Sequence, residues 1–92
     1  MNIELEDLNK MRHALGICER TPRKRWGYRN HYSTNTDDPS MRRLTEAGLV
    51  WRGSVSAATE YGEYASFHVT EAGMRAVGLT AREIARIKAD RW

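Results

Sequence analysis

The chain has 92 residues, of which 40% are hydrophobic and 29% charged, and its formal net charge is +3 at neutral pH. This length is typical of one small globular domain, and it excludes a two-domain enzyme, a full dinucleotide-binding fold and a (β/α)₈ barrel. We therefore expect one domain that spans residues 1–92.

The cysteine count and the lack of membrane-span and signal-peptide patterns indicate the expected location of the protein. Cys18 is the only cysteine, so an intramolecular disulfide is impossible and a disulfide-stapled secreted scaffold is excluded. No stretch approaches the roughly 20 apolar residues of a membrane span, and the acidic first ten residues lack the basic start of a signal peptide. We expect a cytoplasmic protein that makes no membrane contact.

The first expected element is a helix over about residues 3–17. Acidic residues crowd its first turn, where the helix dipole favours negative charge. Apolar side chains recur with the period of a helix face, at Leu8, Met11, Leu15 and Cys18.

Residues 19–37 are expected to be irregular and basic. They contain Pro22 and Gly27 and show no helical period. A structureless run of this length is unusual in a small domain, so we expect either a concealed short helix, for example around residues 26–32, or a segment that a ligand or partner orders. Residues 20–52 hold eight basic against three acidic residues, whereas residues 1–19 have a net charge of −2 and residues 53–92 are neutral.

A short helix is expected next. Asp38 can cap it and Pro39 can be its first residue, because these are favoured types at those positions. Gly48 suits the left-handed position after the helix, with Leu49 packing back on the last turn. Met41 and Leu44 form the apolar face, which leaves the polar side chains largely outside: Ser40, Arg42, Arg43 and Glu46.

A two-stranded β-hairpin is expected after this helix. Its first strand opens at residues 49–52, with Trp51 expected in the core. Its second strand covers residues 64–69, where apolar side chains alternate with polar ones as in a half-buried strand, at Ala65, Phe67 and Val69.

Two short helices end the chain, over about residues 71–77 and 81–91. Thr70 can cap the first, and Thr80 with Glu83 forms a capping box for the second. The elements together predict an α+β fold that is mainly α and winged-helix-like, with helices packed against a two-stranded antiparallel hairpin.

Two stretches resemble a known family. Residues 42–50 (RRLTEAGLV), and residues 64–73 (YASFHVTEAG) beyond the hairpin turn, are similar to the second half of winged helix-turn-helix domains of the multiple-antibiotic-resistance and phenolic-acid repressor families. In those families the recognition helix ends in a Gly-Leu-Val or Gly-Leu-Ile step, and the second wing strand runs into a Thr-Glu-x-Gly helix. The likeness covers residues 38–79, and it implies a small DNA-binding regulator.

The preceding half differs from that family. The helix that comes before the recognition helix in a winged domain is replaced here by the basic loop. The aromatic-Arg-Asn-x-aromatic segment at residues 28–32 is similar to short uncharacterised proteins of tailed bacterial viruses, which implies a phage-type regulator in the interior of the host cell.

The charge pattern favours nucleic acid as the partner. We expect Arg42 and Arg43 to read a DNA groove and the basic segment to hold phosphates while its aromatic residues stack on bases or sugars. The expected nucleic-acid-binding residues are Arg20, Arg23, Lys24, Arg25, Arg29, Ser40, Arg42 and Arg43.

The hairpin tip favours a different class of function. A DNA-binding wing is normally basic, yet Glu60 and Glu63 lie at this tip and no Lys or Arg lies between Gly53 and Phe67. The alternative is a protein–protein interaction module, such as a phage factor that binds or inhibits a host nucleic-acid-processing complex. A homodimer through the first and last helices is also considered, and Trp92 is expected to be exposed.

Catalysis is not expected. The His and Cys residues do not have metal-site spacing, and neither a nucleophile motif nor a glycine-rich phosphate loop is present. We therefore expect no enzyme activity, no cofactor and no metal.

Overall fold

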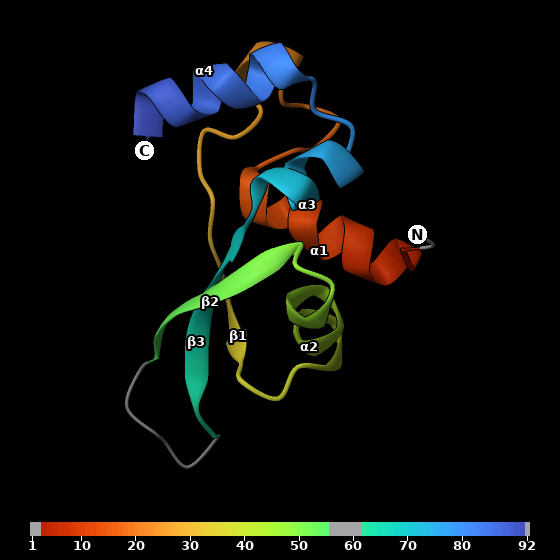
Figure 1. Cartoon of the computed structure of the whole chain (residues 1–92), viewed down its shortest axis with the longest axis vertical. Helices are drawn as coiled ribbons and strands as arrows, with labels where there is room; N and C mark the ends of the chain where they lie inside the picture. Colours follow the sequence, from red (N-terminus) through yellow and green to blue (C-terminus); the bar gives the residue numbers. More distant parts are fainter. Residues whose placement is uncertain (1–2, 56–61, 92) are drawn as a thin grey trace.

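The computed structural model describes residues 3–55 and 62–91, and it shows an α+β fold in which four α-helices accompany a three-stranded antiparallel sheet (Figure 1). The strand order in the sheet is β1-β3-β2. The elements in chain order are α1 (Leu5–Leu15), the 3₁₀ turn η1 (Arg23–Arg25), β1 (Tyr32–Asn35), α2 (Pro39–Glu46), β2 (Val50–Val55), β3 (Tyr64–Val69), α3 (Glu71–Ala76) and α4 (Ala81–Arg91).

The expectation of a two-stranded sheet is wrong. The third strand, β1, comes from the segment expected to be irregular, and it pairs antiparallel with β3 so that Tyr32 lies opposite Phe67. The concealed helix is η1 at residues 23–25 and not a turn at residues 26–32. A strand of four residues is too short to show a period of two, so its partner β3 decides its conformation rather than its own pattern.

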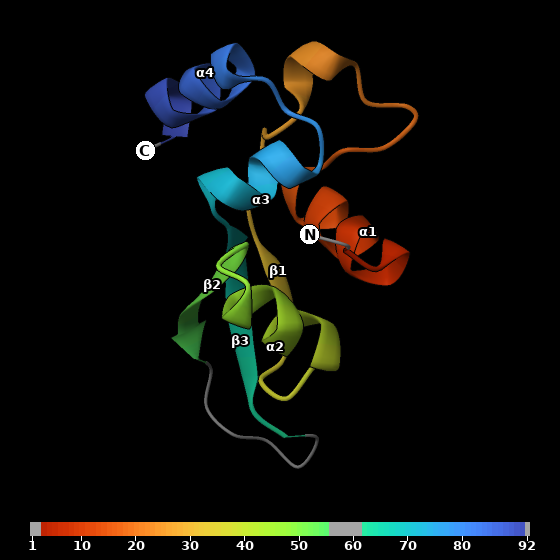
Figure 2. The same cartoon turned by 45° about the vertical axis from the view of Figure 1, so that its right-hand side comes forward.

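The core lies between one face of the sheet and the helices α1 and α2 (Figure 2), and it continues to buried side chains of α3 and α4. Alternate side chains of β3 point into it, as the sequence pattern predicts. The buried apolar residues of α1, α2 and β3 are Met11, Ala14, Leu15, Met41, Leu44, Ala65, Phe67 and Val69.

The helix boundaries expected from capping residues are confirmed. Asp38 Oδ1 accepts a hydrogen bond from the backbone N–H of Met41 at 3.2 Å, which starts α2. Gly48 has a φ of +76°, and the N–H of Leu49 donates to the carbonyl oxygen of Leu44 at 2.9 Å, which ends it. Side-chain caps also start α3 and α4, from Thr70 and from Thr80 with Glu83.

Two residues expected inside the protein are exposed. Trp51 is 50% exposed, because Val50 points into the core and the next residue of a strand must point the other way. Its ring lies against that of His68, with centroids 4.4 Å apart. Cys18 is also exposed, since α1 ends at Leu15 and does not carry the apolar stripe further. Trp92 lies outside the described residues.

The arrangement separates two parts of the chain that are both basic. Figures 1 and 2 show α4 and the η1 segment at one end of the molecule and α2 near the other end, beside the hairpin. Within the described residues, no helix combines the length and apolar character that crossing a membrane requires.

Candidate nucleic-acid interface

Side chains fasten the segment around η1 to α4. Arg23 donates to both carboxylate oxygens of Glu83, at 2.7 and 2.9 Å. In return, Arg86 of α4 donates to the carbonyl oxygens of Lys24 and Trp26. The Arg23 guanidinium lowers the pKa of Glu83 to about 2. Arg23 therefore connects the η1 segment to α4, and the Glu83 carboxylate compensates its charge. This makes Arg23 a poor candidate for phosphate contact.

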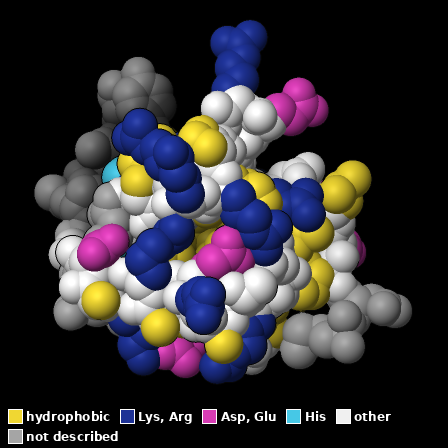
Figure 3. All heavy atoms as spheres, turned by 90° about the horizontal axis from the view of Figure 1, so that it is seen from above, with side chains coloured by type: hydrophobic (Ala, Val, Ile, Leu, Met, Phe, Trp, Pro, Cys, Tyr) yellow, Lys and Arg dark blue, Asp and Glu magenta, His cyan; other side chains and the backbone are white. Residues whose placement is uncertain are grey.

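Lys88 of α4 pairs with Glu71, but several other basic residues near this end have no acidic partner within 4.0 Å among the described residues. Arg86 and Arg29 hydrogen-bond to carbonyl oxygens, which carry no net charge and leave both guanidinium groups uncompensated. Figure 3 looks onto the α4 end, where Lys and Arg side chains spread over much of the surface with a few acidic groups between them. We call these uncompensated residues the basic end: Arg20, Lys24, Arg25, Arg29, Arg82 and Arg86.

A groove of about 600 Å³ opens at the basic end, between the η1 segment and α4. Lys24, Arg25 and Tyr28 line one wall, and residues of α4 line the other. Gly27 lies between the two walls with a φ of +85°, and a Cβ there would lie 2.4 Å from Ile87 Cδ1. Only glycine lets the loop approach α4 this closely, so it determines the shape of the groove.

Two aromatic residues, Trp26 and Tyr28, line this groove, and Tyr28 is the more exposed of them. Tyr28 packs on Gly16, where a Cβ would lie 2.1 Å from the tyrosine ring. The guanidinium carbons of Arg25 and Arg29 lie 6.0 and 5.6 Å from the ring centroid. Tyr28 is nevertheless 42% exposed, so part of its ring remains available to a ligand.

The loop on both sides of Tyr28 caps the C-terminal end of α1. The N–H groups of Gly27 and His31 and the guanidinium of Arg29 donate to the carbonyl oxygens of residues 13–15 at 2.8–3.1 Å. The last carbonyl groups of a helix have no partner within the helix, so these bonds fix the loop to α1. Arg29 therefore has a structural contact as well as an uncompensated charge.

Asn30 is a structural residue that sequence reasoning missed. Its side-chain amide donates to the carbonyl oxygen of Val69 at 3.0 Å, and its Oδ1 accepts from the Val69 N–H at 2.7 Å. The amide thereby continues the pairing of β1 with β3 beyond Tyr32. The sequence marks this asparagine only as part of the aromatic-Arg-Asn-x-aromatic segment and indicates no structural role for it.

Two of the residues expected on the α2 surface face α1 instead. Arg43 forms a bidentate pair with Asp7, with N–O distances of 2.7 and 2.9 Å, and also lies 3.6 Å from Glu4. Ser40 is buried at 1% exposure and accepts a hydrogen bond from Arg43 at 3.3 Å. The expectation that Ser40 lies outside is wrong, because α2 packs its second residue against α1.

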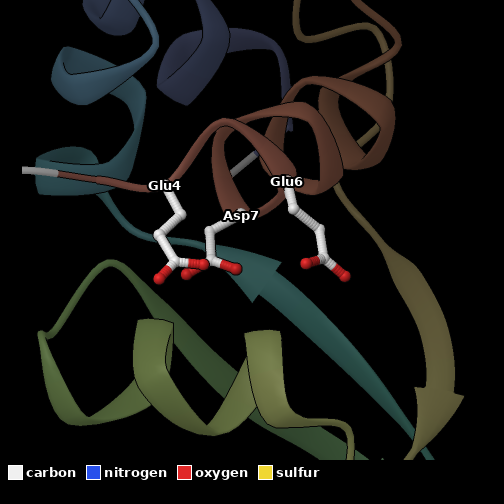
Figure 4. Close-up of side chains that lie close together, drawn as sticks. All are labelled: Glu4, Glu6 and Asp7. Carbon is white, nitrogen blue, oxygen red and sulfur yellow. The ribbon is translucent and has the colours of Figure 1, made fainter.

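The acidic residues opposite Arg43 explain why it is held there. Figure 4 shows Glu4, Glu6 and Asp7 extending from the start of α1 toward α2. Their carboxylate oxygens lie within 4.8 Å of one another. The Arg43 guanidinium pairs with Glu4 and Asp7, and Lys10 lies 3.7 Å from Glu6. Hydrogen bonds from Arg43 lower the pKa of Asp7. Arg43 and Lys10 are thus the cations of this acidic cluster.

Arg42 is exposed on α2, as expected, whereas the guanidinium of the also exposed Arg43 is held by Asp7 and Glu4. Arg42 lines a groove of about 490 Å³ together with Arg52 of β2, Thr45 and Glu46. Neither Arg42 nor Arg52 has an acidic partner within 4.0 Å among residues 3–55 and 62–91. The α2–β2 groove is therefore a second, smaller concentration of positive charge.

No protein-family model, curated protein or solved structure matches this chain. The function must therefore be inferred from the charge and shape of its surface. At the hairpin tip, Glu63 is exposed and Glu60 lies outside the described residues.

Proposed function

We propose that this protein binds nucleic acid through the basic end. The observation that carries the proposal is the set of uncompensated cations beside a groove with an exposed tyrosine. Phosphate groups are the anions that such a surface attracts, with release of counterions from the nucleic acid. Aromatic side chains between basic ones add sequence-tolerant contacts with bases.

The family resemblance suggests a more specific version of this proposal, in which the protein is a phage-type DNA-binding regulator with a winged-helix-like fold. The succession of α2, the β2–β3 hairpin and α3 supports it, as does the solvent-facing position of Arg42. However, no second helix joins α2 through a tight turn within the described residues, and Arg43 and Ser40 are occupied. The proposal therefore places the main contacts on the basic end and leaves Arg42 with Arg52 as a secondary contact.

Fluorescence anisotropy with labelled duplex and single-stranded DNA, at about 50 mM and about 200 mM salt, tests the proposal. We expect binding that weakens as the salt concentration rises. The double variant Lys24→Glu/Arg25→Glu should weaken binding and lower the slope of log affinity against log salt by about 2, because two phosphate contacts are lost.

The matched control is Arg42→Glu/Arg52→Glu, which changes the net charge by the same amount at the other groove. We expect a smaller loss of affinity from the control than from Lys24→Glu/Arg25→Glu. Equal losses would show that only total charge matters, and no binding at the lower salt concentration would reject nucleic-acid binding altogether.

Exposed aromatic residues favour a second candidate, a protein–protein interaction module. Trp51 and Tyr64 are 50% and 39% exposed, and the strand register places both on the sheet face away from α1 and α2. Large aromatic side chains are enriched at protein interfaces. Capture of a host protein complex that survives nuclease treatment and is lost in Trp51→Ala would support this candidate; recovery of nucleic acid alone would count against it.

A further inference from the structure

The groove between η1 and α4 has features that distinguish between kinds of nucleic acid. Its volume of about 600 Å³ lies in the range of sites that enclose small ligands. A duplex is far too wide to enter such a groove and could touch only its rim. An unpaired nucleotide has the dimensions to enter it.

The two walls differ in charge, and the difference orients a ligand. Lys24 and Arg25 are exposed at the η1 wall, whereas the α4 wall carries one cation and one anion, Arg86 and Asp90. A phosphate group is attracted more strongly to the η1 wall, which has two cations, than to the α4 wall, where the opposite charges of Arg86 and Asp90 offset each other. The phosphate of a bound nucleotide is therefore favoured at the rim beside Lys24 and Arg25, and its uncharged base is favoured inside the groove.

Tyr28 provides the surface on which a base can stack. One side of its ring is supported by Gly16, and 42% of the residue is exposed. Arg25 lies 6.0 Å from the ring centroid, at the outer limit of a cation–π contact, so it can move to a phosphate at little cost. Arg86 is fixed to the carbonyl oxygens of Lys24 and Trp26, which holds the two walls in register before any ligand arrives.

We infer that this groove takes one unpaired base of a single-stranded nucleic acid, stacked on Tyr28, with the adjoining phosphates at Lys24 and Arg25. The inference rests on the proposed function and sharpens it, because it names single strands as the preferred ligand. It also separates two contributions to affinity. The phosphates supply the salt-dependent part, and the stacked base supplies a part that requires Tyr28.

The test compares an oligothymidylate of about ten nucleotides with an oligonucleotide of equal length whose central residues are abasic, by anisotropy with the full chain. Both carry the same phosphates, so they differ only in stacking. We expect the oligothymidylate to bind about 5- to 150-fold more tightly. Tyr28→Phe should keep this difference, and Tyr28→Leu should abolish it while weak, salt-dependent binding remains. The melting temperature of each variant shows whether it is folded.

The outcomes separate this inference from the proposed function. Equal affinity of the wild-type protein for the two oligonucleotides would overturn the base site, although binding through phosphates would stand. A difference that persists in Tyr28→Leu would place the stacking elsewhere and would also overturn it. Failure of both oligonucleotides and of duplex DNA to bind would refute the proposed function itself. The comparison in the wild-type protein decides the question even if Tyr28→Leu does not fold.

Discussion

Replacement of Asn30 by alanine is the sharpest test of how the basic segment is held. The substitution removes two hydrogen bonds to the backbone of Val69, a residue with 0% exposure. A hydrogen bond contributes about 0.5–1.5 kcal/mol, and a buried polar group left without a partner costs about 1–3 kcal/mol. We therefore expect Asn30→Ala to lower the free energy of unfolding by about 2–4 kcal/mol, partly offset where water reaches the Val69 peptide.

Urea and thermal unfolding followed by circular dichroism provide the measurement. For a domain of this size, the expected change corresponds to a fall in melting temperature of roughly 8–30 °C. The control is Asn9→Ala, because Asn9 is exposed on α1 and accepts only a long hydrogen bond from Arg12, at 3.3 Å. We expect that variant to change stability by less than about 0.5 kcal/mol. If Asn30→Ala were as stable as the control, Asn30 would not connect the segment to β3.

Two further predictions concern the core and the contact between η1 and α4. Leu44→Ala and Phe67→Ala each remove a large side chain that is at least 96% buried, and each should cost about 2–5 kcal/mol in urea unfolding; an unchanged melting temperature in either variant would contradict the packing described. The pKa of Glu83 is lowered to about 2 by Arg23, so its ionised form stabilises the fold fully above the ordinary pKa of about 4.5, and this contribution is lost as the pH falls towards 2. Glu83→Gln should therefore be less stable than the wild type at pH 7 and should lose that deficit over this range; a deficit independent of pH would show that the ion pair is not its cause.

Local signals predicted most of the secondary structure. The start of α2 follows from Asp38 and Pro39, and its end follows from Gly48 with Leu49, since each signal acts over a few neighbouring residues. The alternation in residues 64–69 likewise identified β3. These elements could be predicted because the residues that determine each one lie within it or directly beside it in the sequence.

Strand β1 could not be predicted in the same way. Its four residues pair with β3, a strand distant in sequence, and Asn30 extends the pairing with its side chain. The prediction that Trp51 lies in the core was wrong for a related reason. A tryptophan beside a buried valine suggests the core by composition, but the register of the sheet assigns alternate residues to opposite faces.

The candidate site was only partly predictable, because a sequence shows which residues are charged but not which charges meet. Arg23 and Arg43 were expected among the cations that contact nucleic acid, yet each faces an acidic residue distant in sequence. Arg86 was not expected at the site, and it lies in the groove because α4 packs against the η1 segment.

The sequence by itself determined that this protein has capped helices, a hairpin and a concentration of positive charge in its middle third, since these properties depend on composition and on neighbours along the chain. Tertiary structure alone decided which cations remain uncompensated, where a groove opens and which end of the molecule carries it. Pairing between charges depends on distance in space, and folding brings the η1 segment to α4 while it brings Arg43 to Asp7.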